Sequence, residues 1–437
     1  MGSERSRSAR FTGREYLVLL VLAGVHFANV MDFMIIMPLG PQYQEDLHIT
    51  PKAFGWLVSV YGFSSSLSGL TAAWFLDRFD RKRSLLVIFG GFTTATLLCA
   101  VSGNYYYLLA ARGLAGVFGG IMASTVMAIV GDLFADARRA TAMSFVMSSF
   151  SVAMIMGIPV GLALGQGVAW WAPFAAIGAL CLPFGAMAFF VLPTVGGHLH
   201  RRHANPWREY GDILTRPTHL RAYLLTTLLI LSSFMVAPFL TTFLVANVGR
   251  AKEELFWIYL CGGGATLVTM NLIGRWADRR GKLPVYRLMA YAAAGPLLLL
   301  TLVPAGTWLV PVLAVTTLMF ITTSGRMVPG MAMLTASATP RHRGSFLSVN
   351  TAVSHMAMSL AAGLAGLILG DTESGAPLEH FPLIGVLAAS IAIVTAMMGG
   401  WIRPAPGGKD ATTSVEVPVI AALPNEEPES ATEAVPA

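Results

Sequence analysis

Twelve long apolar runs follow one another along the chain and make up most of its length. A helix of roughly 20 apolar residues crosses a hydrocarbon layer about 30 Å thick, so each run is long enough to span a membrane. The runs are continuously apolar, whereas the strands of a membrane barrel alternate apolar and polar residues. We therefore expect an all-α membrane protein with twelve transmembrane helices, over residues 15–39, 53–76, 84–103, 105–131, 140–165, 170–192, 221–246, 254–277, 284–304, 307–334, 345–370 and 380–402.

Basic residues predict how these helices are oriented. Of the 29 Lys and Arg residues, 24 lie in the two termini and in every second loop, and the opposite loops hold three. Cytoplasmic loops are enriched in Lys and Arg, so both termini are expected in the cytoplasm, with the helices in a plasma membrane or bacterial inner membrane. The net charge of +6 is then a signal of topology, and the expected partner is the lipid bilayer and not nucleic acid.

A repeated loop motif divides the chain into two halves. Asp77-Arg78, after the second apolar run, recurs 201 residues later as Asp278-Arg279. Internal repeats of this kind form transporters with a binding site between the two halves. The expected organisation is a flexible N-terminus over residues 1–14, a six-helix bundle over 15–192, a cytoplasmic linker over 193–220, a second six-helix bundle over 221–402 and a disordered tail over 403–437.

The same two loops carry a family resemblance. GRWADRRGK, from Gly274 to Lys282, resembles the loop signature of the major facilitator superfamily. LDRFDRKRS, from Leu76 to Ser84, is its first-half version, with Asp80 where a glycine is usual. The resemblance implies two pseudo-symmetric six-helix bundles that rock around a central cavity, in which a small-molecule substrate binds.

The charged loops are the expected gate between the halves. Charges at helix ends can pair with neighbouring helices, and Asp77 is expected near the positive N-terminus of the helix that begins at Gly344. Such contacts would hold the halves together when the cavity faces outward and would break when it opens inward. Residues 81–83 of the first loop have the alternative role of topology anchors. The predicted gate residues are Asp77, Arg78, Asp278 and Arg279.

Two further stretches resemble proton-linked efflux members of the superfamily. LLAARGLAGVFGG, from Leu108 to Gly120, is similar to their arginine-glycine motif. MGIPVGLALGQ, from Met156 to Gln166, is similar to the antiporter signature of the branch that exports sugars and purines, although Trp171 stands where that branch has an arginine. Glycines four residues apart lie on one helix face and allow close approach of a neighbouring helix, which favours packing over a ligand role. The expected packing residues are Gly157, Pro159, Gly161 and Gly165.

Ionisable side chains within membrane spans are costly and usually functional. Asp32 and Arg112 are both expected in the outer part of the bilayer, where they can form an ion pair. A change that separates the pair would allow Asp32 to take up a proton, and the resemblance to proton-linked exporters favours this coupling role over a permanent structural pair. His26 and His355 are further candidates for proton transfer, with the alternative that each only hydrogen-bonds a neighbouring helix.

Candidates for substrate contact lie on several spans. Arg326, near the middle of its span, suits a carboxylate or phosphate of the substrate, or alternatively anchors the backbone around Gly325 and Pro329. Met31 and Met34 belong to a methionine stripe on the first helix, which suits a cavity for varied apolar ligands and equally suits plain helix packing. The expected substrate-binding residues are Met31, Met34, Arg326 and Asn350.

These observations predict a secondary active transporter, and most directly a proton-coupled antiporter that exports a small organic molecule. The sequence has no Gly-x-x-x-x-Gly-Lys-Ser/Thr nucleotide-binding loop, so transport driven by an ion gradient is expected, without a cofactor or metal. A proton symporter that imports an organic anion is the alternative, and a non-transporting membrane sensor is an alternative of another class. No group of residues typical of an enzyme emerges, and a monomer is expected.

Overall fold

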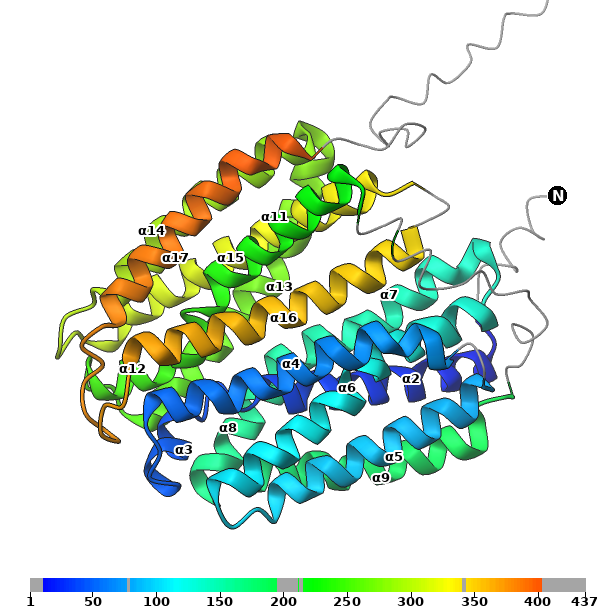
Figure 1. The fold of residues 1–437 in the computed structure, drawn as a ribbon, viewed down its shortest axis with the longest axis horizontal. Coiled ribbons are helices and arrows are strands. Elements are labelled where there is room, and N and C mark those ends of the chain that lie inside the picture. The colour runs from blue at the N-terminus through cyan, green and yellow to red at the C-terminus, as the bar shows by residue number, and fades with distance from the viewer. Residues whose placement is uncertain (1–10, 77–78, 195–210, 212–214, 340–342, 403–437) are drawn as a thin grey trace, which may run out of the picture.

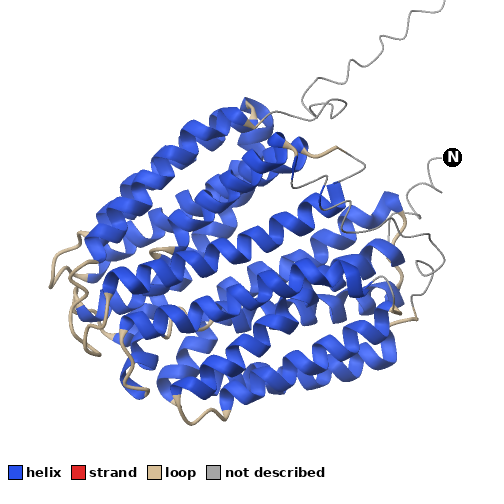
Figure 2. Ribbon diagram, viewed as in Figure 1, coloured by secondary structure: helices blue, strands red, loops and turns tan. Residues whose placement is uncertain are grey.

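The computed structural model describes residues 11–76, 79–194, 211, 215–339 and 343–402. Regular structure within these residues is helical throughout (Figure 2). The first half consists of α2 (Gly13–Met34), α3 (Gly40–Asp46), α4 (Pro51–Leu76), α5 (Arg81–Ala100), α6 (Tyr105–Leu133), α7 (Asp136–Val152), η1 (Ala153–Gly157), α8 (Ile158–Gly167) and α9 (Ala172–Val191). The second half consists of α11 (Pro217–Phe234), η3 (Ala237–Phe239), α12 (Leu240–Ala246), η4 (Lys252–Glu254), α13 (Leu255–Arg280), α14 (Lys282–Thr301), α15 (Leu309–Ser337), α16 (Arg343–Leu369), α17 (Phe381–Met398) and η5 (Gly399–Trp401).

A helix occupies each of the twelve predicted membrane spans, which confirms the predicted fold class. Eleven helices or consecutive helix segments are long and apolar enough to cross a membrane. The 26-residue α4 fills the remaining predicted span. α2 already begins at Gly13, where Thr12 caps it, and α11 begins at Pro217, inside the predicted linker. Residues 195–210 of that linker and the whole predicted tail lie outside the described residues.

The two halves meet at one end of the molecule and diverge toward the other (Figure 1). We call the end that carries α3 and α12 the joined end, and the end at which the described chain begins and finishes the terminal end. Hydrogen bonds between described residues of the two halves lie at the joined end and continue along α4 and α16 as far as Ser65 and His355. The molecule is therefore closed at the joined end.

The first helix of each half is broken near the joined end. α2 ends at Met34 and the chain resumes as α3, whereas a single helix over 15–39 is predicted, and α11 ends at Phe234 before α12. Pro38 and Pro238 lie in the two breaks, where a proline cannot continue the backbone ladder. The carbonyl oxygen of Met37 accepts a hydrogen bond from the Thr241 hydroxyl at 3.1 Å, in addition to one from the Gly40 backbone. The break after α2 therefore contacts α12 of the other half.

α4 and α16 lie side by side and form the long contact between the halves (Figure 1). The hydroxyls of Ser59 and Ser359 donate reciprocally to each other's backbone oxygens, at 2.7 and 2.8 Å. At Gly55 a Cβ would lie 2.8 Å from the carbonyl oxygen of Ala362 and 3.0 Å from the Cα of Gly366. Small residues and interhelical hydrogen bonds are what allow membrane helices to pack closely.

Gly55→Ala is expected to destabilise the protein by about 1–3 kcal/mol, because the added methyl group meets backbone atoms that cannot rotate away. Gly90→Ala is the matched control, since nothing lies within 4 Å of a Cβ at that position in α5. The control is expected to leave the Tm unchanged or to raise it slightly, because alanine favours a helix over glycine. Thermal unfolding of both variants in detergent micelles checks this, and an equal Tm for the two would contradict the close contact of α4 with α16.

Candidate functional site

Asp32 and Arg112 form a fully buried ion pair inside the first half. Nη1 of Arg112, on α6, donates to Oδ2 of Asp32 at 2.8 Å and to the backbone oxygen of Asp32 at 3.0 Å. The Thr96 hydroxyl, on α5, donates to the other carboxylate oxygen at 3.1 Å. Asp32 lies in the last turn of α2, so three helices hold this carboxylate. Each of its oxygens has a donor, which compensates for the removal of the charge from water.

Aromatic rings surround the guanidinium of Arg112. Its Cζ lies 4.4 Å from the ring centroid of Tyr61 and 5.6 Å from that of Phe174, both within the range of cation–π attraction. The Tyr61 hydroxyl in turn donates to the side chain of Asn29 at 3.0 Å. Nε and Nη2 of Arg112 have no hydrogen-bond partner among the described residues. Arg112 therefore has donors left for a rearranged Asp32 or for another anion.

Arg326 is the buried arginine of the second half, on α15. Its Nη2 donates to the hydroxyls of Ser232 and Ser233, both at 2.6 Å, and to the backbone oxygen of Leu229 at 3.3 Å. These partners belong to the C-terminal end of α11, which carries a partial negative charge. Nε and Nη1 have no partner among the described residues. The side chain of Arg326 is thus surrounded by dipoles where Arg112 has a carboxylate.

An apolar cavity of about 300 Å³ lies between the two halves. Residues beside the two helix breaks, η1, α13 and α15 form much of its wall. Seven of the wall residues are methionines, among them Met34 and Met37 of the first half and Met319 and Met327 of the second. The Thr266 hydroxyl in the wall is buried without a partner among the described residues. Such a wall suits a ligand with an apolar body and few polar groups.

The four predicted substrate residues lie in different places. Met34 lines the cavity, and Arg326 is linked to it through Ser233, which is itself part of the wall. Met31 lies behind the wall, where its sulfur packs against the backbone of Gly157. Asn350 is buried within the second half and accepts a hydrogen bond from the Thr226 hydroxyl at 2.7 Å.

The two predicted proton-transfer histidines have serine partners. Nδ1 of His26 lies 2.8 Å from the Ser149 hydroxyl oxygen, within the first half. Nδ1 of His355 lies 3.1 Å from the Ser65 hydroxyl oxygen, across the two halves. The contact of His355 with Ser65 therefore depends on the relative position of the two halves, whereas the contact of His26 with Ser149 lies within one half.

The predicted packing glycines face α2 and the turns that follow it. A Cβ on any of them would overlap a side chain of that segment, and the contacting pairs are Gly157 with Met31, Gly161 with Ile35 and Gly165 with Leu39. Pro159 follows directly after the π-helical turn η1. Because π-helical turns and proline both disturb a helix, this segment bends where it borders the cavity.

The predicted gate residues are only partly described. Asp77 and Arg78 lie outside the described residues. Asp278 and Arg279 are exposed in the last turn of α13, at the terminal end of the molecule. Arg81, in the same loop region as Asp77, forms an ion pair with Asp132 of α6 at 3.2 Å.

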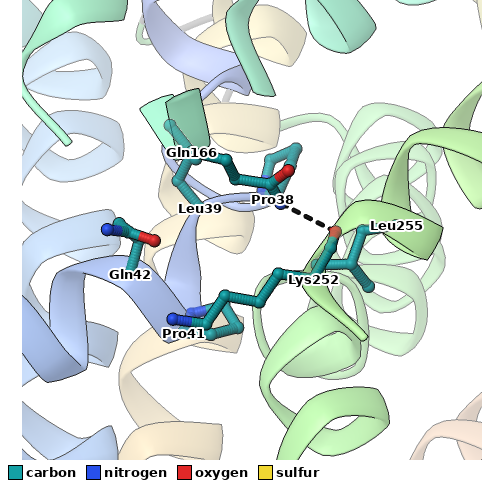
Figure 3. A pocket seen from close by; sticks show the side chains of 7 residues that line it. All are labelled: Pro38, Leu39, Pro41, Gln42, Gln166, Lys252 and Leu255. Carbon is teal, nitrogen blue, oxygen red and sulfur yellow. Dashed lines mark hydrogen bonds between the residues drawn. The ribbon is translucent and has the colours of Figure 1, made fainter. Parts of the chain in front are cut away.

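Charge pairs that the sequence did not predict link the halves at the joined end. Nζ of Lys52 donates to Asp371 at 2.8 Å, and this hydrogen bond lowers the pKa of the Asp371 carboxyl. Lys252 pairs with Glu45 in the same region. Gln166 of α8 donates to the backbone oxygen of Lys252 at 2.8 Å (Figure 3). Exposed charges are common in any sequence, so these pairs carried no signal before the fold was known.

Comparison with known proteins identifies the family to which this chain belongs. The family model described as Major Facilitator Superfamily matches residues 22–311 and 222–424. The chain belongs to the Major Facilitator Superfamily. This superfamily member is 26% identical over 394 residues to an uncharacterized MFS-type transporter, YtbD, of Bacillus subtilis (strain 168), which covers 88% of this chain and 95% of that protein. It is 27% identical over 258 residues to the probable sugar efflux transporter of Helicobacter acinonychis (strain Sheeba), over 58% of this chain and 64% of that protein.

A solved structure supports the same fold. The bacterial homologue of the human lysosomal transporter Spinster, in an inward-facing and unoccupied conformation, superposes with a TM-score of 0.69 at 16% identity, over 91% of this chain and 100% of that one. The predicted family and the predicted absence of an enzymatic role are confirmed, because the superfamily consists of secondary transporters.

In this superfamily member, Asp32→Ala and Arg112→Met are each expected to destabilise the fold by about 3–5 kcal/mol, because each leaves one buried charge without a partner. The double variant is expected to lose much less than the sum of the two, since neither charge remains. The comparison cycle Lys52→Met with Asp371→Ala removes an exposed pair and is expected to leave the Tm almost unchanged. Thermal unfolding in micelles measures all variants, and strictly additive losses for Asp32 and Arg112 would contradict their coupling.

Proposed function

We propose that this transporter is a proton-coupled antiporter that exports a small organic molecule by alternating access of the central cavity. The observation that carries the proposal is the buried ion pair of Asp32 with Arg112. Asp32 belongs to α2, and the end of this helix also reaches the cavity. Asp32 is two residues before Met34, which lines the cavity wall. A ligand that holds the end of α2 in place therefore keeps the carboxylate, less than one helical turn away, beside Arg112.

Proton uptake follows from the environment of Asp32. While Arg112 and Thr96 donate to it, the ionised carboxylate is stabilised. When the ligand leaves, a movement of α2 away from α5 and α6 removes these donors, and an unpaired carboxylate in an apolar bundle is strongly disfavoured against its protonated form. Substrate occupancy and proton occupancy thereby become alternatives, which is the requirement for exchange.

The distribution of basic residues assigns the terminal end to the cytoplasm. With this orientation the joined end faces outward, and the molecule adopts an inward-facing arrangement. Asp278 and Arg279, in the last turn of α13, then lie on the cytoplasmic side. This position agrees with the proposed gate, whose contacts break when the cavity opens inward.

The cavity wall favours an amphipathic substrate over a sugar. One relative is named as a probable sugar efflux transporter. A sugar carries many hydroxyl groups, each of which loses its hydrogen bonds to water unless the wall replaces them. The wall contains mostly apolar side chains, and its hydroxyl groups come from Ser233, Tyr259, Thr266, Thr323 and Ser324.

A proton symporter that imports an organic anion is the second candidate. The nitrogens of Arg326 and Arg112 without a partner among the described residues are compatible with it, because both arginines can donate to a substrate carboxylate. The direction of substrate movement relative to the proton distinguishes the two candidates: an antiporter brings protons in as substrate leaves, and a symporter brings both in together.

Asp32→Asn is expected to abolish substrate-driven proton movement in vesicles that contain a pH-sensitive dye, because the amide cannot take up the proton. The amide keeps the size of the side chain, so exchange of labelled for unlabelled substrate is expected to continue. A panel of drugs, sugars, purines and organic acids supplies the substrate, and rates are compared per folded protein.

Asp46→Asn makes the same chemical change at an exposed position of α3 and serves as the control. It is expected to keep the wild-type proton flux. Undiminished proton flux in Asp32→Asn would rule out coupling through Asp32 and would transfer the role to His26 or His355.

Exchange of the two charges of a joined-end pair tests alternating access. Lys52→Asp alone is expected to open the joined end, because it places two carboxylates together. Labelling of Met37→Cys with a membrane-impermeant maleimide, in a protein without its native cysteines, measures the opening, since Met37 is buried when the end is closed. The restored pair, Lys52→Asp with Asp371→Lys, is expected to return labelling to the original rate. Equal labelling of the single and double variants would exclude a gating role for this pair.

A further inference from the structure

The two halves carry a buried arginine on corresponding helices, α6 and α15. Arg112 of α6 and Arg326 of α15 are each followed by a glycine four residues later. Each guanidinium reaches the last turn of the first helix of its own half, α2 or α11. Each half therefore holds a buried cation against the end of its first helix, although Arg112 is the eighth residue of α6 and Arg326 is the eighteenth residue of α15.

The partner of the arginine differs between the halves. The end of α2 reads Asp32-Phe33-Met34, and the end of α11 reads Ser233-Phe234-Met235. The offset between these segments is 201 residues, the same as between the repeated loop motifs. Ser233 therefore occupies the position that corresponds to Asp32, with a hydroxyl group in place of a carboxylate.

The charge of Arg326 consequently lacks an anion. Its hydrogen-bond partners are two hydroxyl groups and one backbone oxygen, and two of its nitrogens have no partner among the described residues. A buried guanidinium in an apolar bundle is strongly destabilised unless an anion pairs with it. Arg112 has such an anion in Asp32. Arg326 has two nitrogens that can donate to an anion.

The central cavity reaches this site. Ser233 belongs to both the cavity wall and the arginine site, because its side chain lines the cavity and its hydroxyl oxygen accepts from Arg326 at 2.6 Å. Ser324 and Met327, on either side of Arg326 in α15, also line the cavity. Arg326 therefore lies directly behind a wall residue of the methionine-lined cavity.

We propose that the substrate is an amphipathic organic anion whose carboxylate pairs with Arg326, in the way that Asp32 pairs with Arg112 in the first half. This proposal deepens the proposed transport function and rests on it. The planar guanidinium supplies several N–H donors in a fixed geometry suited to carboxylate, and Ser232 adds a hydroxyl group beside it. The methionine-lined cavity receives the apolar body of the ligand, which explains why a single polar site is sufficient.

The test uses octanoate as the probe and octanamide as its uncharged equivalent. Wild-type protein in detergent micelles is expected to bind octanoate about tenfold or more tightly than octanamide, because the charge-assisted hydrogen bonds are lost with the amide. Isothermal titration calorimetry measures both. Equal affinity for the two probes, or no binding of octanoate, would overturn the proposal.

Ser233→Asp supplies the missing carboxylate from the protein itself. The variant is expected to raise the Tm, because Arg326 gains a permanent partner, and to weaken octanoate binding by about tenfold or more, because the partner occupies the site. Ser233→Asn has the same size without the charge and is expected to keep most of the octanoate affinity. Equal loss in both variants would show that bulk alone blocks the cavity, and unchanged binding in Ser233→Asp would show that Arg326 is a structural anchor only.

The failure of this proposal is distinct from the failure of the antiport proposal. A neutral compound that drives proton flux in the wild type, and not in Asp32→Asn, would leave proton-coupled transport standing and would contradict an anionic substrate. Octanoate binding that responds to Ser233→Asp, without any proton flux, would support the anion site and contradict the coupling role of Asp32.

Discussion

A guanidinium buried in an apolar helix bundle needs its charge compensated, and this requirement organises both halves of the molecule. In the first half the compensation comes from Asp32, held by donors from α5 and α6. In the second half Arg326 has only hydroxyl groups and the negative end of α11. Paired charges are far more stable than single ones in such surroundings. The arginine of the first half therefore has its counter-ion within the protein, and under our proposal a ligand supplies the counter-ion of the second.

The breaks in α2 and α11 connect these charge sites to the movement of the halves. Each break follows within a few residues of an arginine partner, Asp32 or Ser233, and the first break contacts α12 through the hydrogen bond of Thr241 to Met37. A continuous helix would transmit a change at its centre only as a rigid body. A broken helix allows the segment beside the cavity to move while the segment at the joined end stays in contact with its partner, so local ligand contact can alter the closure of the halves.

The sequence predicted the twelve spans because hydropathy acts over whole helices, and it placed Asp32 and Arg112 together because two ionisable groups at one depth of an apolar bundle have few other partners. It did not separate Met31, which packs on Gly157, from Met34, which lines the cavity, since hydropathy does not fix the rotation of a helix. The pair of Lys52 and Asp371, 319 positions apart, is exposed and has no local pattern that marks it. Long-range charge pairs of this kind become visible only when the fold brings the loops together.

The difference between the two arginine sites also affects the energetics of transport. If one proton enters through Asp32 as one monovalent anion leaves from Arg326, two positive charge equivalents move inward in each cycle. An inside-negative potential of about 100 mV then contributes about 4.6 kcal/mol to export, at about 2.3 kcal/mol for each charge. Import of the same anion together with one proton moves no net charge and gains nothing from the potential. A buried cation without a fixed counter-ion is therefore suited to an exporter, because the membrane potential itself expels the anion that the cation has recruited from the cytoplasm.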